Sequence, residues 1–422
     1  MLMVDKKRTI LFIMPRLPFP AVSGRKTSLY HYCRILSDEL GYRLVVAAFL
    51  EKGDEQKQVP GFIDKLIVLP QPGIKTKVMN ILKDSIIKRE KPLQVSLYWN
   101  PEAKKIVERL VKEEKPQIVI ADMVRCTEYI KDLSAFCIAD LDDRISLRYQ
   151  RQLQADIDGI NPYGAFINAI PKILKKFLLL KPIKLFVIKN EIDLLKNYEL
   201  KIGKICDKII FVAQKEAEEF NRELGEQKAK AVPIGVDIDY FSYCRQSSRY
   251  NYIGFLGAMD VAHNESAIRH FVADILPYIL IKVPDLKLLV IGSGGSDELK
   301  KLESDHVVFT GKVKDVREYL KQCKVFICPL SFGSGIKTKN LEAMSMGIPV
   351  VTTYIGAENI GAKNGQDWII AENDEDYALQ ICNLLEKPEL REKIRKNGRK
   401  FVETYWTWNA AREAFIQILK WE

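Results

Sequence analysis

The sequence predicts an α/β protein built from two doubly wound parallel sheets. Short apolar runs alternate with helical stretches along the first half of the chain, and the same alternation is repeated in the second half. Uninterrupted apolar runs indicate strands that are buried on both faces, and helices between such strands favour a parallel sheet. At 422 residues, the chain is also too long for one comfortable core and suits two domains.

The predicted strands form two series, with a crossing between them. The first series is 9–14, 44–49, 66–69, 118–121, 136–141 and 208–212, and the second is 252–256, 286–291, 307–310, 325–329, 349–353 and 368–371. Glycine and proline punctuate residues 232–241, which predicts domains at 1–231 and 232–407. An amphipathic helix is predicted at the chain end, at about 408–422.

The composition is that of a soluble globular protein, with 47% hydrophobic and 28% charged residues. The eight cysteines show no Cys-x-x-Cys spacing and several lie in apolar runs, so they indicate reduced core thiols in a reducing compartment. The four scattered histidines offer no metal-ligand spacing. The apolar part of the N-terminal segment is too short for a signal peptide, and no apolar run reaches the ~20 residues that span a membrane. We therefore expect a cytoplasmic protein without a bound metal.

The segment 331–351 is the most informative part of the chain. A glycine-rich loop runs directly into a predicted helix, whose free N–H groups and macrodipole favour an anion, and Lys337 and Lys339 add positive charge. Glu342 lies about one and a half turns further on, within reach of a ribose hydroxyl. A nucleotide-sugar pocket is predicted here; an ordinary loop–helix–strand unit is the alternative. The predicted donor-binding residues of this segment are Gly333, Ser334, Gly335, Ile336, Lys337, Lys339, Leu341 and Glu342.

This segment resembles the donor-binding signature of retaining GT-B glycosyltransferases of family four, in which a Glu-x7-Glu pair precedes Ala-Met and Gly-x-Pro-Val-Val. Glu342 matches the second glutamate, whereas Ser334 stands at the position of the first. The Gly-x-Lys-x-Lys run from Gly335 to Lys339 is similar to a variant found in sugar transferases of bacterial polysaccharide-export systems. The resemblance covers nearly the whole chain. It implies two Rossmann-like domains facing across a cleft, the first binding the acceptor and completed by the C-terminal helix, the second binding the donor.

In each series, a further glycine-containing turn follows the first strand. After the first strand, Gly24 permits close backbone approach and Arg25 would neutralise a phosphate or bind an acceptor; a proline-rich turn with solvated cations is the alternative. After the first strand of the second series, at 257–264, the chain resembles the Gly-x-Met-x-x-x-x-Asn pattern of the export-associated transferases. Gly257 and Asn264 are donor-binding candidates on that basis, although Asn264 would also serve as a helix N-cap.

The resemblance assigns further roles on the donor side. Common members of the family carry an Arg and a Lys in the 257–264 turn, and their absence here makes Lys337 and Lys339 the expected diphosphate neutralisers. By the same resemblance, the backbone of Val313 would meet the edge of the base.

The catalytic group is less defined, because relatives often place a histidine shortly after the strand at 118–121 and none occurs here. Asp122 and Arg125 are candidates at that strand end, with Lys337 on the donor side; a plain strand-end turn is an equal alternative. Asp140, Asp142 and Asp143 form a second acidic group, which would suit a hydrolase or a metal. Their place in a loop favours solvated charge or acceptor contacts instead.

The net charge of +10 has a local source, because no acidic residue occurs between Gly159 and Asn190. The lysines of 172–189 alternate with apolar residues at helical spacing, which predicts a basic amphipathic element for peripheral membrane binding. The predicted membrane-facing lysines are Lys172, Lys175, Lys176, Lys181 and Lys184. A core-facing helix with solvated lysines is the alternative. Nucleic acid is excluded as a partner because no stacking motif accompanies the charge.

These features together predict a retaining, metal-independent glycosyltransferase at the cytoplasmic face of a membrane. It would move a sugar from a UDP- or GDP-linked donor to a glycan or lipid-linked acceptor in bacterial surface polysaccharide synthesis, with no cofactor. One alternative is a nucleotide-sugar epimerase on the same scaffold, which needs acid–base carboxylates and often a histidine. The other is a non-catalytic nucleotide-sugar-binding subunit, which the absent glutamate and histidine favour.

Overall fold

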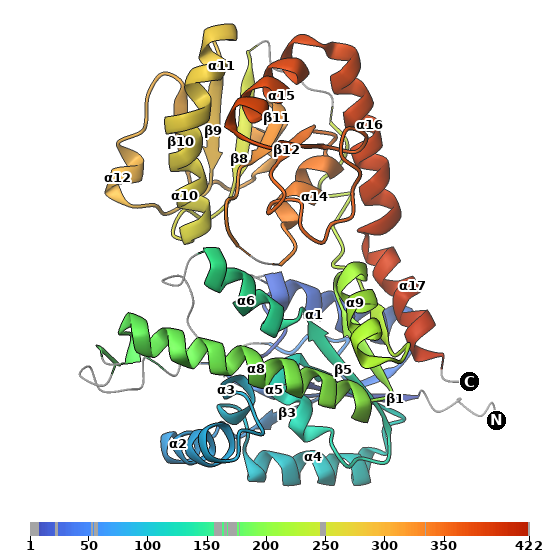
Figure 1. The fold of residues 1–422 in the computed structure, drawn as a ribbon. Coiled ribbons are helices and arrows are strands. Elements are labelled where there is room, and N and C mark those ends of the chain that lie inside the picture. The colour runs from blue at the N-terminus through green and yellow to red at the C-terminus, as the bar shows by residue number, and fades with distance from the viewer. Residues whose placement is uncertain are drawn as a thin grey trace, which may run out of the picture. The chain divides into compact units, whose positions relative to one another are not determined.

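The computed structural model describes residues 8–21, 24–51, 54, 58–155, 163, 167, 175–176, 178–244, 250–333 and 335–420. The chain divides into two compact units (Figure 1). Unit 1 consists of Met1–Ile234 together with Ala411–Glu422, and unit 2 consists of Gly235–Ala410.

Unit 1 contains a parallel sheet of seven strands in the order β3-β2-β1-β4-β5-β6-β7. Its strands are β1 (Thr9–Met14), β2 (Arg43–Phe49), β3 (Lys65–Leu69), β4 (Ile118–Asp122), β5 (Phe136–Asp142), β6 (Lys208–Phe211) and β7 (Ala229–Ala231). All six predicted strands of the first series are confirmed. The edge strand β7 was not predicted, because its sequence Ala-Lys-Ala is too short and too weakly apolar to show a pattern.

Helices cover both faces of this sheet, and α4, α8 and α9 share an apolar core with one face of the strands. The helices of unit 1 are α1 (Gly24–Arg34), η1 (Ile35–Glu39), α2 (Ile74–Asn80), η2 (Ile81–Ile87), α3 (Leu93–Ser96), α4 (Pro101–Glu114), α5 (Met123–Cys126), η3 (Thr127–Tyr129), α6 (Ile145–Ala155), α8 (Lys181–Ile205) and α9 (Gln214–Leu224). The last helix of the chain, α17 (Trp408–Leu419), ends in unit 1, where the ring of Phe415 meets Tyr32 of α1 edge-on at 5.1 Å between centroids.

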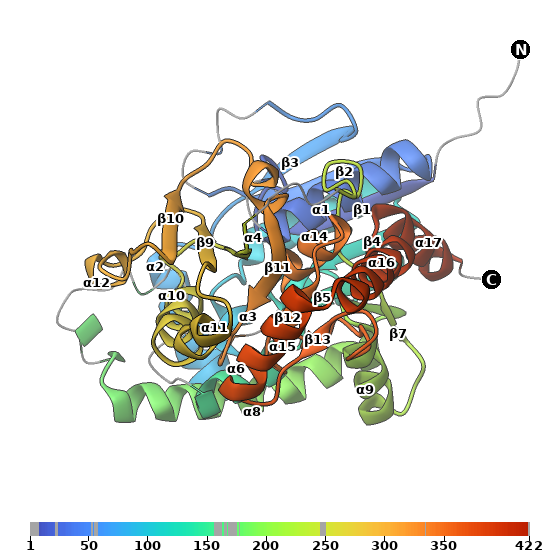
Figure 2. The same ribbon diagram turned by 90° about the horizontal axis from the view of Figure 1, so that it is seen from above.

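Unit 2 contains a parallel sheet of six strands in the order β10-β9-β8-β11-β12-β13. They are β8 (Tyr252–Leu256), β9 (Lys287–Ile291), β10 (Val307–Gly311), β11 (Cys323–Cys328), β12 (Val350–Thr352) and β13 (Ile369–Ile370), which confirms the second predicted series. The helices are α10 (Ala262–His270), η5 (Phe271–Ile275), α11 (Leu276–Lys282), α12 (Asp297–Lys300), α13 (Arg317–Leu320), α14 (Thr338–Ser345), α15 (Asp374–Glu386) and α16 (Pro388–Tyr405) (Figure 2).

The strand order reverses once in each sheet, between β1 and β4 in unit 1 and between β8 and β11 in unit 2. At such a switch point, the two loops that leave the carboxyl ends of the strands diverge, and the crevice between them is where open α/β sheets bind ligands. Each unit therefore presents one topologically favoured site, flanked by the loops after its first and fourth strands in chain order.

Seven of the eight cysteines are buried, and all eight carry free thiols. Burial raises the pKa of the Cys206 thiol to about 12, so this thiol is protonated and unreactive at neutral pH. None of the helices in the described part of the chain has the length and apolar character needed to cross a bilayer.

Candidate functional site

The switch point of unit 2 is flanked by the β8–α10 loop and the β11–α14 loop. Asn264 lies in the first turn of α10, directly after the first of these loops; it is buried, and its Nδ2 donates to the carbonyl of Ala258 in that loop at 2.9 Å. A Cβ at Gly257 would lie only 2.8 Å from Asn264 Nδ2, so a side chain there would displace the asparagine. The N-cap interpretation of Asn264 is wrong: the N-cap of α10 is Val261, and Asn264 lies inside the helix.

Lys339 of α14 connects the starts of the two helices that follow these loops. Its Nζ donates to Asn264 Oδ1 at 2.7 Å and lies 4.1 Å from the centroid of the Phe255 ring. Burial lowers the pKa of Lys339, opposed by Cys328 and Glu342. An ammonium group has three donors, so the bond to Asn264 fixes the position of Lys339 without exhausting its capacity.

Lys337 lies immediately before the first residue of α14 and is buried. Its Nζ donates to the carbonyl of Gly335 at 2.8 Å. The loop that carries it requires glycine, because Gly333 and Gly335 adopt φ angles of 132° and 72°. The first N–H groups of α14 have no partners within the helix, so charge and backbone donors converge at this helix start.

Glu342 lies one turn beyond this helix start and is partly buried. Burial raises its pKa to about 7, although a side-chain hydrogen bond from Thr338 and the charge of Lys339 act in the opposite direction. The neighbouring Leu341 is fully buried, so its side chain packs inside unit 2. Ile336 is partly buried, Val313 lies beyond the end of β10 at the sheet edge, and Ser334 lies outside the described residues.

His263 is a member of this site that the sequence did not single out. A Cβ at Gly333 would lie 3.7 Å from its ring and 3.7 Å from Lys337 Cε, so His263 and Lys337 flank the same glycine. Burial, together with Lys339 and Lys337, lowers the pKa of His263 to about 4, so the imidazole is neutral at pH 7. The sequence feature that could have identified His263 is its position one residue before Asn264. We considered the histidines only for metal-ligand spacing, and that criterion does not detect this feature.

The switch point of unit 1 holds a cluster of charges around Arg25. Its Nε donates to Asp122 Oδ1 at 3.0 Å, its Nη2 lies 2.7 Å from Asp140 Oδ2, and its Nη1 donates to Asp142 Oδ1 at 2.9 Å. The side chains of Arg25, Asp122 and Asp140 are 9%, 0% and 1% exposed. The alternative of a solvated cation is therefore wrong for Arg25, because its buried guanidinium pairs with three carboxylates, whereas its role towards a phosphate or an acceptor stays a prediction.

Burial determines the pKa values of the aspartates in this cluster. Burial raises the pKa of Asp140 to about 7, against the attraction of Arg25, and burial likewise raises the pKa of Asp122. Burial raises the pKa of Asp143 as well. The interpretation of this acidic group as solvated charge is wrong for Asp140. Asp142 and Met123, at the ends of β5 and β4, have φ angles of 67° and 58°, which adds backbone strain at this sheet edge.

The two catalytic candidates of unit 1 have different partners. Asp122 is bound to Arg25, whereas the Nε of Arg125 donates to Gln94 Oε1 at 2.9 Å. The guanidinium carbon of Arg125 also lies 5.2 Å from the centroid of the Tyr98 ring. Gly24 begins α1, and apart from its chain neighbours no atom of the described residues lies within 4 Å of a Cβ placed on it.

The predicted membrane lysines are placed unevenly. Lys176 and Lys181 are exposed, Lys175 is partly exposed, and Lys172 lies outside the described residues. Lys184 is only 5% exposed. Its assignment to a lipid-facing surface is therefore wrong, because α8 turns this lysine towards unit 1.

The chain is similar to known proteins in both sequence and fold. Residues 250–387 match the family described as glycosyl transferases group 1. The chain is 23% identical to an uncharacterized 44.6 kDa protein in the cps region of Klebsiella pneumoniae, over 71% of this chain and 74% of that protein. It is 25% identical to a GDP-mannose-dependent monoacylated alpha-(1-6)-phosphatidylinositol monomannoside mannosyltransferase of Corynebacterium glutamicum, over 53% of this chain and 64% of that protein.

A likeness in fold extends over both units. The solved structure of Alr3699/HepE from Anabaena in complex with UDP matches with a TM-score of 0.59, covering 97% of this chain and 99% of that one. At 14% sequence identity, this match concerns the fold alone.

Proposed function

We propose that this chain, whose residues 250–387 match the glycosyl transferases group 1, is a GT-B glycosyltransferase of family four that transfers a sugar from a UDP- or GDP-linked donor to a glycan or lipid-linked acceptor, with retention of anomeric configuration. The observation that carries the proposal is the helix start of α14, where Lys337, Lys339 and Glu342 converge within the matched segment. The relatives in capsular and phosphatidylinositol contexts support an acceptor that belongs to a surface glycoconjugate.

In this proposal, the diphosphate lies against the N-terminus of α14. Its negative charge increases as the glycosidic bond to the donor sugar breaks, and pre-placed N–H groups and ammonium groups stabilise such charge best. Lys337 and Lys339 supply two positive charges there, so the leaving group needs no metal ion and the reaction no cofactor. Neutral His263 lies beside them and would offer one further hydrogen bond.

Glu342 is proposed to bind a ribose hydroxyl of the donor. Its position four residues after Thr338 places it on the same face of α14 as the helix start. The base is proposed as uracil or guanine, because one relative is named for GDP-mannose and the solved neighbour holds UDP. In unit 1, Asp122 and Arg25 are proposed to shape the acceptor side as a rigid ion-paired cluster, and the reaction is proposed to take place at the cytoplasmic face of a membrane.

A thermal-shift screen of nucleoside diphosphates tests the donor pocket, since a ligand that binds the folded state raises the melting temperature. We expect UDP or GDP to stabilise the parent protein. Replacing Glu342 by Ala removes a charged hydrogen-bond acceptor worth about 1.5–3 kcal/mol, so binding should weaken roughly ten- to a hundredfold. An unchanged affinity in Glu342→Ala would show that the pocket has been placed wrongly.

A further inference from the structure

The segment α2–η2, residues 74–87 of unit 1, is one continuous helix whose outer side is apolar. The residues at its junction, Asn80 and Ile81, both have right-handed helical backbone angles. Six of the 21 exposed large hydrophobic residues among those described lie in these 14 residues, and each of the six is 42–77% exposed. They are Ile74, Val78, Met79, Leu82, Ile86 and Ile87.

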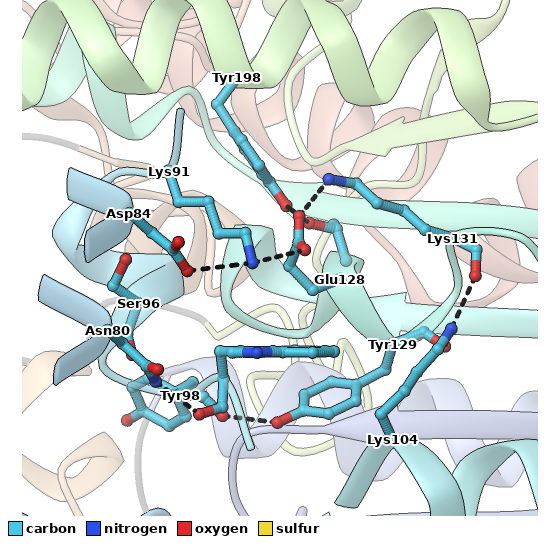
Figure 3. A network of polar contacts seen from close by, with 12 residues as sticks. Asn80, Asp84, Lys91, Ser96, Tyr98, Lys104, Glu128, Tyr129, Lys131 and Tyr198 are labelled. Carbon is cyan, nitrogen blue, oxygen red and sulfur yellow. Dashed lines mark hydrogen bonds and ion pairs between the residues drawn. The ribbon is translucent and has the colours of Figure 1, made fainter. Parts of the chain in front are cut away.

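The inner side of the same helix is polar (Figure 3). Asn80 Nδ2 donates to the carbonyls of Ser96 at 3.0 Å and Trp99 at 2.8 Å. Ser85 Oγ lies 2.9 Å from Ser96 Oγ. The carboxylate of Asp84 lies 3.4 Å from Lys91 Nζ, which also pairs with Glu128 at 3.1 Å. Polar bonds therefore hold this helix against the rest of unit 1, and its apolar side is turned outward. This orientation is the reverse of that of an ordinary surface helix.

The exposed charges beside this apolar side are nearly all positive. Lys75, Lys83, Lys88 and Arg89 are exposed, whereas Asp84 is buried and Glu90 is the one exposed acidic residue between 74 and 90. These aliphatic side chains are bordered by lysines and an arginine. They are complementary to a partner with a negatively charged surface and an apolar interior. An anionic phospholipid bilayer has that composition.

The apolar surface continues onto the start of α8. Ile81 of η2 packs with Leu178 and Val187 around the buried residues Leu93, Tyr163 and Ile167. Beyond this shared cluster, Leu179, Leu180 and Phe186 are exposed, as are the basic residues Lys176 and Lys181. The expected membrane element at 172–189 is thus a neighbour of the larger apolar surface on α2–η2.

We propose that α2–η2 is the membrane-docking surface of this protein and that its partner is an anionic phospholipid bilayer. The helix lies in the plane of the interface, its aliphatic side chains enter the acyl region, and Lys75, Lys83, Lys88 and Arg89 contact the phosphates. A lipid partner is favoured over a protein partner because residues 74–89 contain no tryptophan or tyrosine of the kind that anchors protein interfaces. Binding to a bilayer would bring the enzyme to the lipid-linked acceptor of the proposed function. Only this biological purpose of the membrane binding rests on the proposed function.

Vesicle co-sedimentation of the full chain, without nucleotide, tests the proposal. The vesicles contain phosphatidylcholine alone or phosphatidylcholine with phosphatidylglycerol. The apolar variant carries Met79→Gln, Ile86→Gln and Ile87→Gln, and its control carries Ile205→Gln, Ile281→Gln and Leu379→Gln at similarly exposed positions elsewhere. The charge variant carries Lys83→Gln, Lys88→Gln and Arg89→Gln, and its control carries Lys393→Gln, Lys396→Gln and Lys400→Gln on α16. The nucleotide-induced thermal shift of each variant reports on the fold and the donor site.

We expect the parent and both controls to bind the anionic vesicles, and both α2–η2 variants to bind at least about tenfold less at low salt. Each variant should keep its nucleotide-induced thermal shift, which separates this inference from the proposed function. The proposal is overturned if the parent does not bind anionic vesicles, or if the α2–η2 variants bind as the parent does. It is also overturned if light scattering shows a dimer that the apolar variant abolishes, because the occupant would then be a second copy of the chain.

Discussion

At the scale of single residues, Glu342 is proposed to bind the donor ribose, and the pKa of its carboxyl group lies in the physiological range. Its pKa is about 7 in the folded protein, against about 4.3 in an unfolded chain, because burial disfavours the carboxylate. The folded state therefore holds a proton that the unfolded state has lost between these values. The stability that this carboxyl contributes is complete below about pH 4 and is lost as the pH rises through about 7.

Glu342→Gln should abolish this dependence, because a neutral amide has no proton to lose. We expect the variant to gain on the order of 2–3 kcal/mol relative to the parent between pH 5 and pH 8, while its affinity for nucleoside diphosphate falls. Urea unfolding at the two pH values provides the measurement. A difference in stability that stays constant with pH would mean that Glu342 is ionised throughout.

Arg25 should be far more important for stability than an exposed arginine. Arg25→Met leaves Asp122 and Asp140 buried without their cation, and breaking a buried ion pair in this way costs about 3–5 kcal/mol. Since both carboxyl groups have raised pKa values, they can accept protons at low pH, and the cost should be smaller at pH 5.5 than at pH 8. Arg109→Met, at an exposed position on α4, is the control and should change stability little. A small, pH-independent loss in Arg25→Met would contradict the ion-paired geometry.

The sequence could not predict these residue-level partners, because they are far apart along the chain. Arg25 is separated from Asp122 by 97 residues and from Asp142 by 117, and only the sheet topology brings their strand ends together. The roles of Gly333 and Gly335 were easier to predict, because a loop that runs into a helix restricts the backbone locally. His263 was missed for the opposite reason: its role depends on the β11–α14 loop, more than sixty residues later in the sequence.

At the scale of secondary structure elements, the start of α14 is where charge and backbone donors coincide. The variant Lys337→Met with Lys339→Met keeps the apolar stems of both side chains while removing their charges. We expect its affinity for nucleoside diphosphate to fall at least about tenfold, with a melting temperature close to that of the parent in the absence of ligand. Lys312→Met, an exposed change in the same unit, is the control. Calorimetric titration and thermal unfolding separate the two effects; lost stability with unchanged affinity would make these lysines structural.

Strands were the best-predicted elements, because those of a parallel sheet are buried on both faces and give continuous apolar runs. The exception is β7, where Ala-Lys-Ala carries no such run. Helical periodicity shows that one side of a helix is apolar but does not show which side meets the protein. In α2–η2, Asn80 and Asp84 face inward and the aliphatic residues face outward, an orientation that depends on hydrogen bonds to Ser96 and Trp99 and so appears only in the structure.

At the scale of the whole molecule, the proposed activity requires both a donor and an acceptor. Nucleoside diphosphate should be released at a substantial rate only when a glycan or lipid-linked acceptor is present, and a chelator should leave that rate unchanged, because Lys337 and Lys339 supply the charge. Mass spectrometry of the donor pool measures this directly. Conversion of the nucleotide sugar into an isomer without acceptor would indicate an epimerase, and a donor pool unchanged with every acceptor would indicate a binding subunit.

Amide hydrogen exchange with and without a nucleoside diphosphate tests the central claim most directly, because it locates the ligand on the chain. UDP or GDP, whichever gives the larger thermal shift, should slow exchange in peptides that cover 257–264 and 335–342, where backbone N–H groups and the α14 helix start surround the proposed diphosphate. Exchange in α15 and α16 serves as the internal reference and should change little. Unchanged exchange at 257–264 and 335–342, with protection in other segments, would contradict the donor site described for this protein.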